Sequence, residues 1–388
     1  MRIVQLANFY SPTSGGLRTV VDTLGRGYAA LGHERILVVP GQHADRRRTE
    51  SGLVITVPGV PVGGGYRVMP RSRAVLKLLD AFAVGRSKMS VEVSDKTTLL
   101  AAGEWARARG VGTVLFSHER LDRWIAARLP RLWKGGAAVL APAVRSWNQG
   151  LATKFDTVVV TSGYAEREFA GLDVALRRVP LGVDLATFRP APHDSGPGPA
   201  RLVYAGRLSP EKNPAAVIGA MRVLAGTGKP ACLDVYGDGP ALTTLRKQAR
   251  DLPVTFHGHV GDRRELAGAL SRADVAFAPS VAETFGLSIL EAMACGTPVV
   301  TSANGGAPEL LAPGAGVAVP ATPDGLAAGV IDILSWPAAR RRRAARRRAE
   351  QFPWSNTITA MLDLHASPGP SSRTGRGRGR GGTATAIP

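Results

Sequence analysis

Cysteine is nearly absent from this sequence of 388 residues, which contains only Cys232 and Cys295. Two cysteines without a CxxC spacing exclude a disulfide-stapled secreted scaffold and a zinc ribbon. Long apolar runs are also missing: the longest uncharged stretch, residues 292–308, is interrupted by glycine and proline, so no membrane-spanning helix is expected. The basic N-terminus is not followed by an apolar segment, so no signal peptide is expected either. These absences predict a soluble protein of a reducing, cytoplasmic compartment.

Acidic residues are outnumbered, because 49 Lys and Arg against 30 Asp and Glu give a net charge of +19. The excess lies near the C-terminus, in an arginine run at residues 340–348 and in an acid-free tail from residue 366. A basic surface is typical of proteins attracted to anionic lipid or nucleic acid. We expect the run to form a helix whose cationic face rests on an anionic membrane surface or is simply solvated. We expect the Arg/Gly-rich tail, residues 366–388, to be disordered.

Short apolar runs alternate with helical stretches in two rounds. They occupy residues 2–7, 36–40, 89–93, 111–116 and 157–160, and then residues 202–205, 232–236, 254–256, 275–278 and 299–301. This alternation predicts parallel sheets covered by helices on both faces. Residues 189–200 are rich in proline and glycine, as in a linker. The sequence therefore predicts an α/β protein of two tandem doubly wound domains, with a ligand cleft between them at the carboxyl ends of the strands.

Residues 279–300 combine the end of a strand, a loop and the start of a helix. The loop carries Glu283, Gly286 opens the helix, and Gly296 follows its end. A helix N-terminus at the carboxyl edge of a sheet offers free amides and a positive partial charge to phosphate. Glu283 and Glu291 suit the hydroxyl groups of a sugar and a ribose. An ordinary helix with a solvated glutamate is the alternative interpretation.

Two cations follow the first strand of the second half. Arg207 and Lys212 lie in one strand-to-helix loop, GRLSPEKN at residues 206–213, at the same edge of the sheet as Glu283. Arginine can bind a diphosphate by forked hydrogen bonds and lysine can bind it as a point charge. A solvated loop with a Glu211–Lys212 pair is the alternative. Together the two segments describe a site for a nucleotide-diphosphate sugar.

Several motifs together resemble the retaining glycosyltransferases of family 4, which have the GT-B fold. They are Gly15-Gly16, His118-Glu119, LGVD (181–184), GRLSPEKN (206–213), GDGP (237–240) and the Glu283/Glu291 pair around FGLSILEAMACGTPVV. The resemblance covers about residues 1–365. It implies Rossmann-like domains with parallel sheets facing a central cleft: an N-terminal acceptor-side domain (1–188), a linker (189–200) and a nucleotide-sugar-binding domain (201–350). A helix over residues 351–365 is expected to cross back to the N-terminal domain.

Further runs, at residues 8–22, 64–67, 91–96 and 117–122, are similar to one branch of this family. That branch transfers mannose from GDP-mannose to lipid glycosides such as phosphatidylinositol mannosides. The resemblance implies GDP-mannose as donor substrate with no further cofactor, a lipid glycoside acceptor and no nucleic-acid partner. It also implies a peripheral location at the inner face of the plasma membrane.

The resemblance assigns catalytic roles to four residues. Arg207 and Lys212 are expected to hold the diphosphate and to stabilise its charge as it leaves, which is the electrostatic assistance that such a transfer needs. Glu283 is expected to contact the hydroxyls of the donor sugar. His118 is expected across the cleft from that sugar, with a core or surface histidine as the alternative.

Further donor contacts follow from the same resemblance. Glu291 is expected to take the ribose hydroxyls, and the amides of Phe285, Gly286 and Leu287 are expected near the sugar and phosphate. Gly16 should let its loop approach the donor phosphate closely, because a Cβ would clash. No constellation of metal-binding residues is evident in the sequence. Arg207 and Lys212 are expected to supply the positive charge that a metal ion would otherwise supply.

The implied reaction is transfer with retention, so that α-linked GDP-mannose gives an α-mannoside. We expect attack on the front face, with the leaving phosphate accepting the proton of the acceptor hydroxyl. Closure of the two domains over the donor should exclude water and limit hydrolysis. On the acceptor side the candidates are weaker: Tyr66, Arg67, Asp95 and Lys96 could face a phosphoinositol headgroup, or they could be surface or structural residues.

Two other functions are compatible with parts of the sequence. Another family 4 glycosyltransferase, using a UDP-sugar and a different acceptor, would show the same motifs. A basic nucleic-acid-binding protein would explain the charge, but it would leave the cleft motifs without a role. Its binding would fall steeply with salt.

Overall fold

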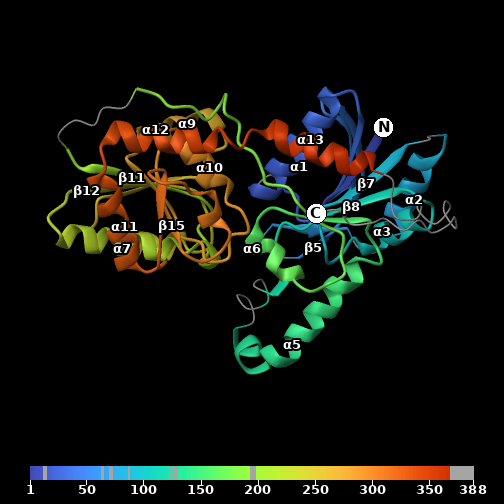
Figure 1. Cartoon of the computed structure of the whole chain (residues 1–388), viewed down its shortest axis with the longest axis horizontal. Helices are drawn as coiled ribbons and strands as arrows, with labels where there is room; N and C mark the ends of the chain where they lie inside the picture. Colours follow the sequence, from blue (N-terminus) through green and yellow to red (C-terminus); the bar gives the residue numbers. More distant parts are fainter. Residues whose placement is uncertain are drawn as a thin grey trace, which may run out of the picture.

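The computed structural model of the chain describes residues 1–11, 15–62, 65–69, 73–85, 88–122, 125, 130–192 and 198–367. The expected disordered tail, from residue 368 onward, and residues 193–197 of the expected linker lie outside the described residues. Figure 1 shows two α/β halves side by side, with the last helix reaching from the second half back over the first. None of the described helices is long and apolar enough to cross a membrane.

The first half is built on an eight-stranded sheet with the order β10-β9-β8-β7-β1-β2-β4-β3. Its strands are β1 (Arg2–Leu6), β2 (Glu34–Gly41), β3 (Asp45–Thr49), β4 (Gly52–Pro58), β7 (Met89–Val93), β8 (Gly112–Phe116), β9 (Thr157–Val160) and β10 (Leu176–Arg178). All its strand pairs are parallel except β3 with β4, which form an antiparallel hairpin at one edge. A second, two-stranded hairpin joins β5 (Val60–Pro61) to β6 (Arg67–Val68).

The second half contains a six-stranded sheet that is parallel throughout, with the order β13-β12-β11-β14-β15-β16. Its strands are β11 (Ala200–Ala205), β12 (Ala231–Tyr236), β13 (Val254–Gly258), β14 (Val275–Ala278), β15 (Val299–Ser302) and β16 (Gly316–Val319). The expectation of two doubly wound α/β domains is therefore confirmed. The two hairpins, β10 and β16 were not expected.

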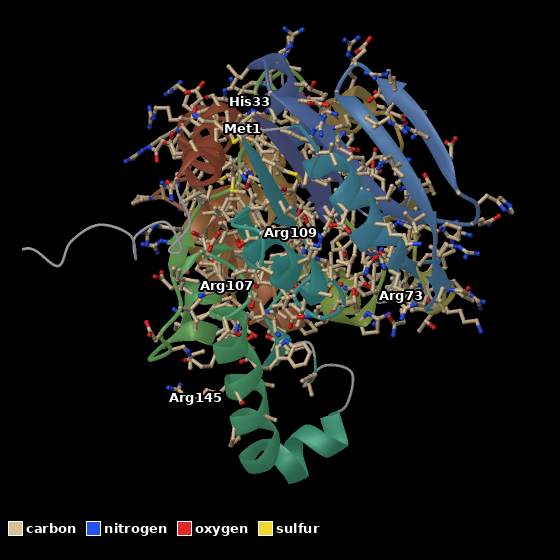
Figure 2. All side chains as sticks on the ribbon, turned by 90° about the vertical axis from the view of Figure 1, so that its right-hand side faces the viewer. Met1, His33, Arg73, Arg107, Arg109 and Arg145 are labelled. Carbon is tan, nitrogen blue, oxygen red and sulfur yellow. The ribbon has the colours of Figure 1, made fainter. Side chains whose placement is uncertain are left out.

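Helices cover both faces of each sheet. In the first half, α1 (Gly16–Ala30) and α13 (Trp354–Ala366) lie on one face, and α2 (Arg73–Ala83), α3 (Leu100–Arg107) and the end of α5 (Pro130–Leu151) lie on the other. In the second half, α7 (Pro214–Gly226), α8 (Leu242–Gln248) and α11 (Pro323–Ser335) face α9 (Arg263–Arg272), α10 (Leu287–Ala294) and α12 (Ala338–Ala349) across the sheet. Figures 1 and 2 both show α5, with Arg145 on it, projecting from the first half.

One apolar cluster crosses from the first half to the second. It contains Ile3 and Leu24 from the first sheet and α1, and Leu270 and Leu290 from α9 and α10. The return of the chain is part of this contact, because Val183 donates its backbone N–H to the carbonyl of Phe352 at 2.8 Å. The two sheets thus pack on a shared core, which fixes the position of one sheet relative to the other.

A buried polar network lies between the first sheet and the helices α1 and α13. Arg35 donates to Gln5 at 2.8 Å, Gln5 donates to Glu92 at 2.8 Å, and Tyr28 and His365 also contact the Glu92 carboxylate. Burial raises the pKa of Glu92, but the hydrogen bonds from His365, Gln5 and Tyr28 outweigh it and the pKa is lowered. His365 comes from α13, so this network fastens the last helix to the N-terminal sheet.

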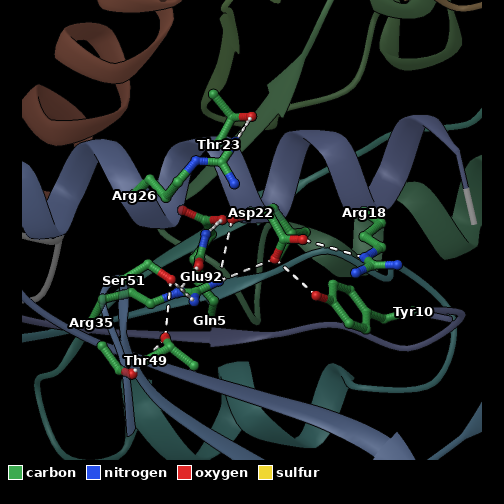
Figure 3. Close-up of polar contacts among 12 residues, drawn as sticks. Gln5, Tyr10, Arg18, Asp22, Thr23, Arg26, Arg35, Thr49, Ser51 and Glu92 are labelled. Carbon is green, nitrogen blue, oxygen red and sulfur yellow. Dashed lines mark hydrogen bonds and ion pairs between the residues drawn. The ribbon is translucent and has the colours of Figure 1, made fainter. Parts of the chain in front are cut away.

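The same network continues toward the start of α1. Figure 3 shows Asp22 next to Arg35 and accepting a hydrogen bond from the hydroxyl of Tyr10 at 2.8 Å. Arg18, on the same helix, also contacts Asp22. Tyr10 follows β1 and Asp22 lies on α1, so these contacts tie the residues after β1 to that helix.

The arginine run forms helix α12, as expected, but most of its side chains do not make a solvated or membrane-facing surface. Arg342 donates to the carbonyl oxygens of Ser271, Ala273 and Cys295, at 2.7 to 3.3 Å. The guanidinium groups of Arg341, Arg346 and Arg348 likewise reach backbone carbonyls of neighbouring segments. The expectation fails for these four arginines because the ends of α9, α10 and α11 and the turn at Ala307–Leu310 leave carbonyls that need donors. Arg340, Arg343 and Arg347 are exposed.

Candidate active site

Two helix N-termini face each other across the two halves of the molecule. Gly16 is the first residue of α1 and Leu287 is the first residue of α10. A Cβ added at Gly16 would lie 4.0 Å from the Cδ1 atom of Leu287. Each N-terminus presents backbone N–H groups without helical partners and a positive partial charge. A phosphate group placed between them would meet a helix N-terminus on both sides.

Gly286 precedes α10 in a conformation that other residues adopt with strain. Its φ is 107°, and a Cβ there would come within 2.8 Å of the Cδ1 atom of Ile289. Glycine alone lets the chain turn this sharply between the loop and the helix. Phe285, just before it, is buried and meets the ring of Phe352 edge-on, with the centroids 6.3 Å apart. The loop that carries Glu283 is thus fixed at its C-terminal end.

Lys212 and Glu283 form an ion pair at the carboxyl edge of the second sheet. The Nζ atom of Lys212 lies 2.5 Å from Oε2 of Glu283, and both side chains are partly exposed. Lys212 follows β11 and Glu283 follows β14, and these strands are hydrogen-bonded neighbours. Burial lowers the pKa of Lys212, but the Glu283 carboxylate outweighs it and the pKa is raised. The ammonium group therefore stays charged at neutral pH.

Arg207 reaches across to the first half of the molecule. Its Nη2 donates to the hydroxyl of Tyr66, and its guanidinium carbon lies 5.2 Å from the centroid of the Tyr66 ring. Phe9 meets the same ring edge-on at 6.2 Å. A residue expected on the donor side thus touches one expected on the acceptor side, which the sequence did not indicate.

His118 follows β8 and lies against the loop of the second half. Its ring stacks on Phe116 at a centroid distance of 4.5 Å, and its carbonyl accepts a hydrogen bond of 2.6 Å from the hydroxyl of Thr284. Burial lowers the pKa of His118 to about 4, so the imidazole is neutral at physiological pH. Among the described residues, its buried Nε2 atom has no hydrogen-bond partner. A sugar hydroxyl in the cleft could supply that partner.

Glu291 lies about one turn into α10, with most of its side chain covered. Its Oε1 accepts a hydrogen bond of 2.8 Å from Arg263, at the start of α9. Burial raises the pKa of Glu291 and the Arg263 guanidinium opposes this. The negative charge of Asp184 also raises the pKa of Glu291. The pKa of Asp184 itself is lowered, because hydrogen bonds from the backbone and side chain of Thr187 outweigh the effect of burial. Arg263 was not expected from the sequence, because an arginine in a first helical turn carries no distinctive signal.

The acceptor-side candidates separate into two groups. The carboxylate of Asp95 accepts hydrogen bonds from the backbone of Thr97 and Thr98, and Lys96 is buried against Glu168 at 2.6 Å. Burial lowers the pKa of Lys96, and the Glu168 carboxylate opposes this. These partners favour a structural role for Asp95 and Lys96 over the expected contact with a headgroup.

The other two candidates belong to the hairpin of β5 and β6. The side chain of Arg67 donates to the carbonyl of Gly59 at 2.6 Å, which is a contact within the hairpin. Tyr66 is the one candidate of the four whose described contacts reach the second half of the molecule.

Direct contacts also join the two halves of the molecule beside these residues. The Ser162 hydroxyl donates to the Thr284 carbonyl at 2.5 Å. The Glu309 carboxylate accepts from the backbone N–H groups of Gly163 and Tyr164 at 2.8 and 2.7 Å. Neither Ser162 nor Glu309 was expected from the sequence, since nothing in the pattern around them distinguishes them from ordinary surface residues. Within the described residues, no group of three His, Cys, Asp or Glu side chains could hold a metal ion.

Comparisons with known proteins agree with this geometry. The family described as Glycosyl transferases group 1 matches residues 188–352, and the Glycosyl transferase 4-like domain matches residues 15–182. The chain is 43% identical to the GDP-mannose-dependent alpha-(1-6)-phosphatidylinositol dimannoside mannosyltransferase of Mycobacterium tuberculosis, over 97% of this chain and 98% of the relative. It is 31% identical to a glycogen synthase of the same species, over 94% of each chain.

Solved structures show the same fold. The sucrose-phosphate synthase of Thermosynechococcus elongatus matches with a TM-score of 0.73 at 21% identity, over 94% of this chain and 98% of that one. The HepE protein of Anabaena, in complex with UDP and glucose, matches with a TM-score of 0.71 at 18% identity, over 95% and 100%. The chain is a hexosyltransferase, and it belongs to the family 4, or group 1, glycosyltransferases of the GT-B fold.

Proposed function

We propose that this protein transfers a mannosyl residue from GDP-mannose to a lipid-linked glycoside, such as a phosphatidylinositol mannoside, and that it forms an α-mannoside. The observation that carries the proposal is the convergence of Lys212, Glu283 and the N-terminus of α10 opposite Gly16. This arrangement offers cations and free amides to a diphosphate, and a carboxylate to a sugar. The mycobacterial relative that is 43% identical uses GDP-mannose, which favours that donor.

We assign the diphosphate to Lys212 and Arg207, which would neutralise the negative charge that grows as GDP leaves. The amides of Phe285 to Leu287 and the start of α1 would complete the anion site. Glu291 would accept hydrogen bonds from the ribose hydroxyls. Glu283, which keeps Lys212 charged, would accept from hydroxyls of the mannose.

His118 would contact the mannose from the first domain. Among the described residues, the buried Nε2 atom of its neutral imidazole has no hydrogen-bond partner, and a hydroxyl of the sugar would supply one. We propose that the acceptor hydroxyl attacks from the same face as the leaving diphosphate and passes its proton to the phosphate oxygen. This route retains the anomeric configuration and needs no protein carboxylate as nucleophile.

We propose that the enzyme acts at an anionic membrane surface, the inner face of the plasma membrane. The net charge of +19 and a lipid-linked acceptor both support it. Helix α12 contributes less than the sequence indicated, because only three of its arginines are exposed. Sedimentation with vesicles tests this: binding to anionic vesicles that is lost at high salt supports it, and equal binding to zwitterionic vesicles contradicts it.

Calorimetric titration of the purified protein with GDP-mannose, GDP and UDP-glucose tests the donor. Selective binding of GDP and GDP-mannose supports the proposal, whereas selective binding of UDP-glucose overturns the donor and the acceptor together. Lys212→Met should weaken GDP binding by about tenfold or more, because a charged hydrogen bond is lost. Lys229→Met removes an exposed lysine far along the chain and serves as the matched control.

The acceptor needs a separate assay with phosphatidylinositol mannosides and labelled GDP-mannose. Transfer of label into a lipid product supports the proposal, and its anomeric configuration can be read by nuclear magnetic resonance. An α-mannoside is expected; a β-linked product would contradict the retaining mechanism.

A further inference from the structure

Among the described residues, Tyr66 is the one aromatic side chain of the first domain that contacts a residue proposed to bind the diphosphate. Arg207 donates to its hydroxyl and lies over its ring at 5.2 Å. We propose that Tyr66 is a positioning residue for Arg207, which it orients toward the donor diphosphate from the opposite domain. The inference rests on the proposed function, and it moves Tyr66 from a possible acceptor contact to the donor half of the reaction.

The backbone around Tyr66 is restrained by hydrogen bonds. The backbone N–H of Val62 donates to the Tyr66 carbonyl at 3.1 Å, and that of Phe9 donates to the Arg67 carbonyl at 3.3 Å. The fully buried Asn8 accepts from the backbone N–H of Met69 at 2.7 Å, which ties the end of β1 to the same hairpin. Tyr66 is therefore held from β1 and from its own hairpin before any ligand arrives.

Phe9 adds a second restraint. It adopts a φ of 57°, which is uncommon for a residue other than glycine, and this conformation brings its ring edge-on to Tyr66 at 6.2 Å. A strained residue persists only where its surroundings fix it, and such residues concentrate at functional sites. Phe9 thereby limits the positions that the Tyr66 ring can take.

Holding the Arg207 guanidinium in place before the donor binds should strengthen donor binding. A free arginine side chain loses rotamer entropy when it is fixed on a ligand, and that loss weakens binding. Stacking on Tyr66 removes part of this freedom in advance. A guanidinium carries five N–H donors, and the phenol oxygen takes one, so donors remain for phosphate oxygens. Tyr66 can orient Arg207 without competing for all of its hydrogen bonds.

Titration of the full-length protein with GDP, with no acceptor present, tests the inference. Tyr66→Ala should weaken GDP binding by about threefold to fivefold, the range expected for an exposed cation–π contact. Tyr66→Phe keeps the ring and should lose about twofold or less. Val60→Ala, which trims an exposed side chain on the same hairpin, is the matched control and should leave GDP affinity unchanged.

A double-mutant cycle separates positioning from general damage. In an Arg207→Ala background, Tyr66→Ala should cause no further loss of GDP affinity, because the contact is already gone. Guanosine, which lacks phosphate, should bind equally well to the wild type and to Tyr66→Ala. Unchanged GDP affinity in Tyr66→Ala, or losses that simply add in the double variant, would overturn the inference and return Tyr66 to the acceptor.

The donor proposal fails in a distinguishable way. If the wild type prefers UDP over GDP, the proposed donor is wrong, while the same variants titrated with UDP still decide the role of Tyr66. If the wild type binds neither nucleoside diphosphate, both proposals are overturned.

Discussion

At the scale of single residues, His118 carries a pH dependence that can be measured. Its pKa is about 4 in the folded protein and about 6.5 in an unfolded chain, because burial disfavours the charged ring. Between these values the unfolded chain binds more protons, so the free energy of unfolding decreases as the pH falls from 6.5 to 4. This difference in pKa corresponds to about 3 kcal/mol of stability, which is fully present above pH 6.5 and is lost as the pH falls to 4.

We expect His118→Asn to flatten the pH dependence of unfolding in this window. The measurement is urea denaturation at pH 4.5 and pH 7.0, compared between the variant and the wild type. His43→Asn, at an exposed histidine, is the control and should keep the wild-type slope. An unchanged slope for His118→Asn would mean that the imidazole is not held neutral by its surroundings.

Glu291 allows a test at the scale of one hydrogen bond. We expect Glu291→Gln to weaken GDP binding by about tenfold, since a hydrogen bond to a charged acceptor contributes about 1.5 to 3 kcal/mol. Calorimetry with GDP and with 2′-deoxy-GDP is the measurement. The loss should be smaller with the deoxy ligand, because the ribose hydroxyl is already missing. Equal losses with both ligands would place Glu291 away from the 2′-hydroxyl.

At the scale of elements, α12 shows how a helix composed largely of arginine can be stabilised by its neighbours. Its arginines supply donors to carbonyls that α9 and α10 leave unpaired at their C-terminal ends. Guanidinium groups suit this role, because one side chain can donate to several oxygens at once. The helix is therefore part of the packing of the second domain.

We expect Arg342→Ala to lower the free energy of unfolding by about 1 to 3 kcal/mol, because three carbonyls lose a donor. Arg343→Ala, at the exposed neighbouring position, should change it by about 0.5 kcal/mol or less. Chemical denaturation of the two variants is the measurement. Similar losses in both would mean that the carbonyl contacts of Arg342 do not stabilise the fold.

At the scale of the whole molecule, the two domains meet through a shared apolar cluster and a few polar contacts at the cleft. Glu309 is one of these contacts, because it accepts hydrogen bonds from Gly163 and Tyr164 of the first domain. It has no proposed contact with the donor. Its loss should therefore affect domain closure more than donor affinity.

We expect Glu309→Ala to lower the rate of transfer by about threefold to tenfold while GDP affinity stays within about twofold, since the contact is worth about 1 kcal/mol. Turnover and calorimetry measure the two effects. Glu350→Ala, whose partner Arg346 lies on the same helix, is the control and should change neither. A parallel loss of GDP affinity would show that Glu309 shapes the donor site itself.

The sequence by itself determined most of the strands and helices, and it determined which residues meet at the carboxyl edge of the second sheet. Strands β7 and β14 begin and end at the expected residues, and α10 lies between the expected glycines, Gly286 and Gly296, because apolar runs and capping glycines act over short distances. Glu283, Gly286 and Lys212 meet for the same reason, since parallel neighbouring strands end at one edge of a sheet. A local pattern is sufficient for such a site.

Only the tertiary structure decided which partners the charged and polar residues found. Arg207 and Tyr66 are 141 positions apart, and the three carbonyls that Arg342 contacts lie at the ends of two separate helices, α9 and α10. Asp95 and Lys96 are engaged inside their own domain, although they were candidates for contact with a headgroup. Such contacts depend on how the two domains and their helices pack around a common core, and the spacing of residues within one segment does not determine that packing.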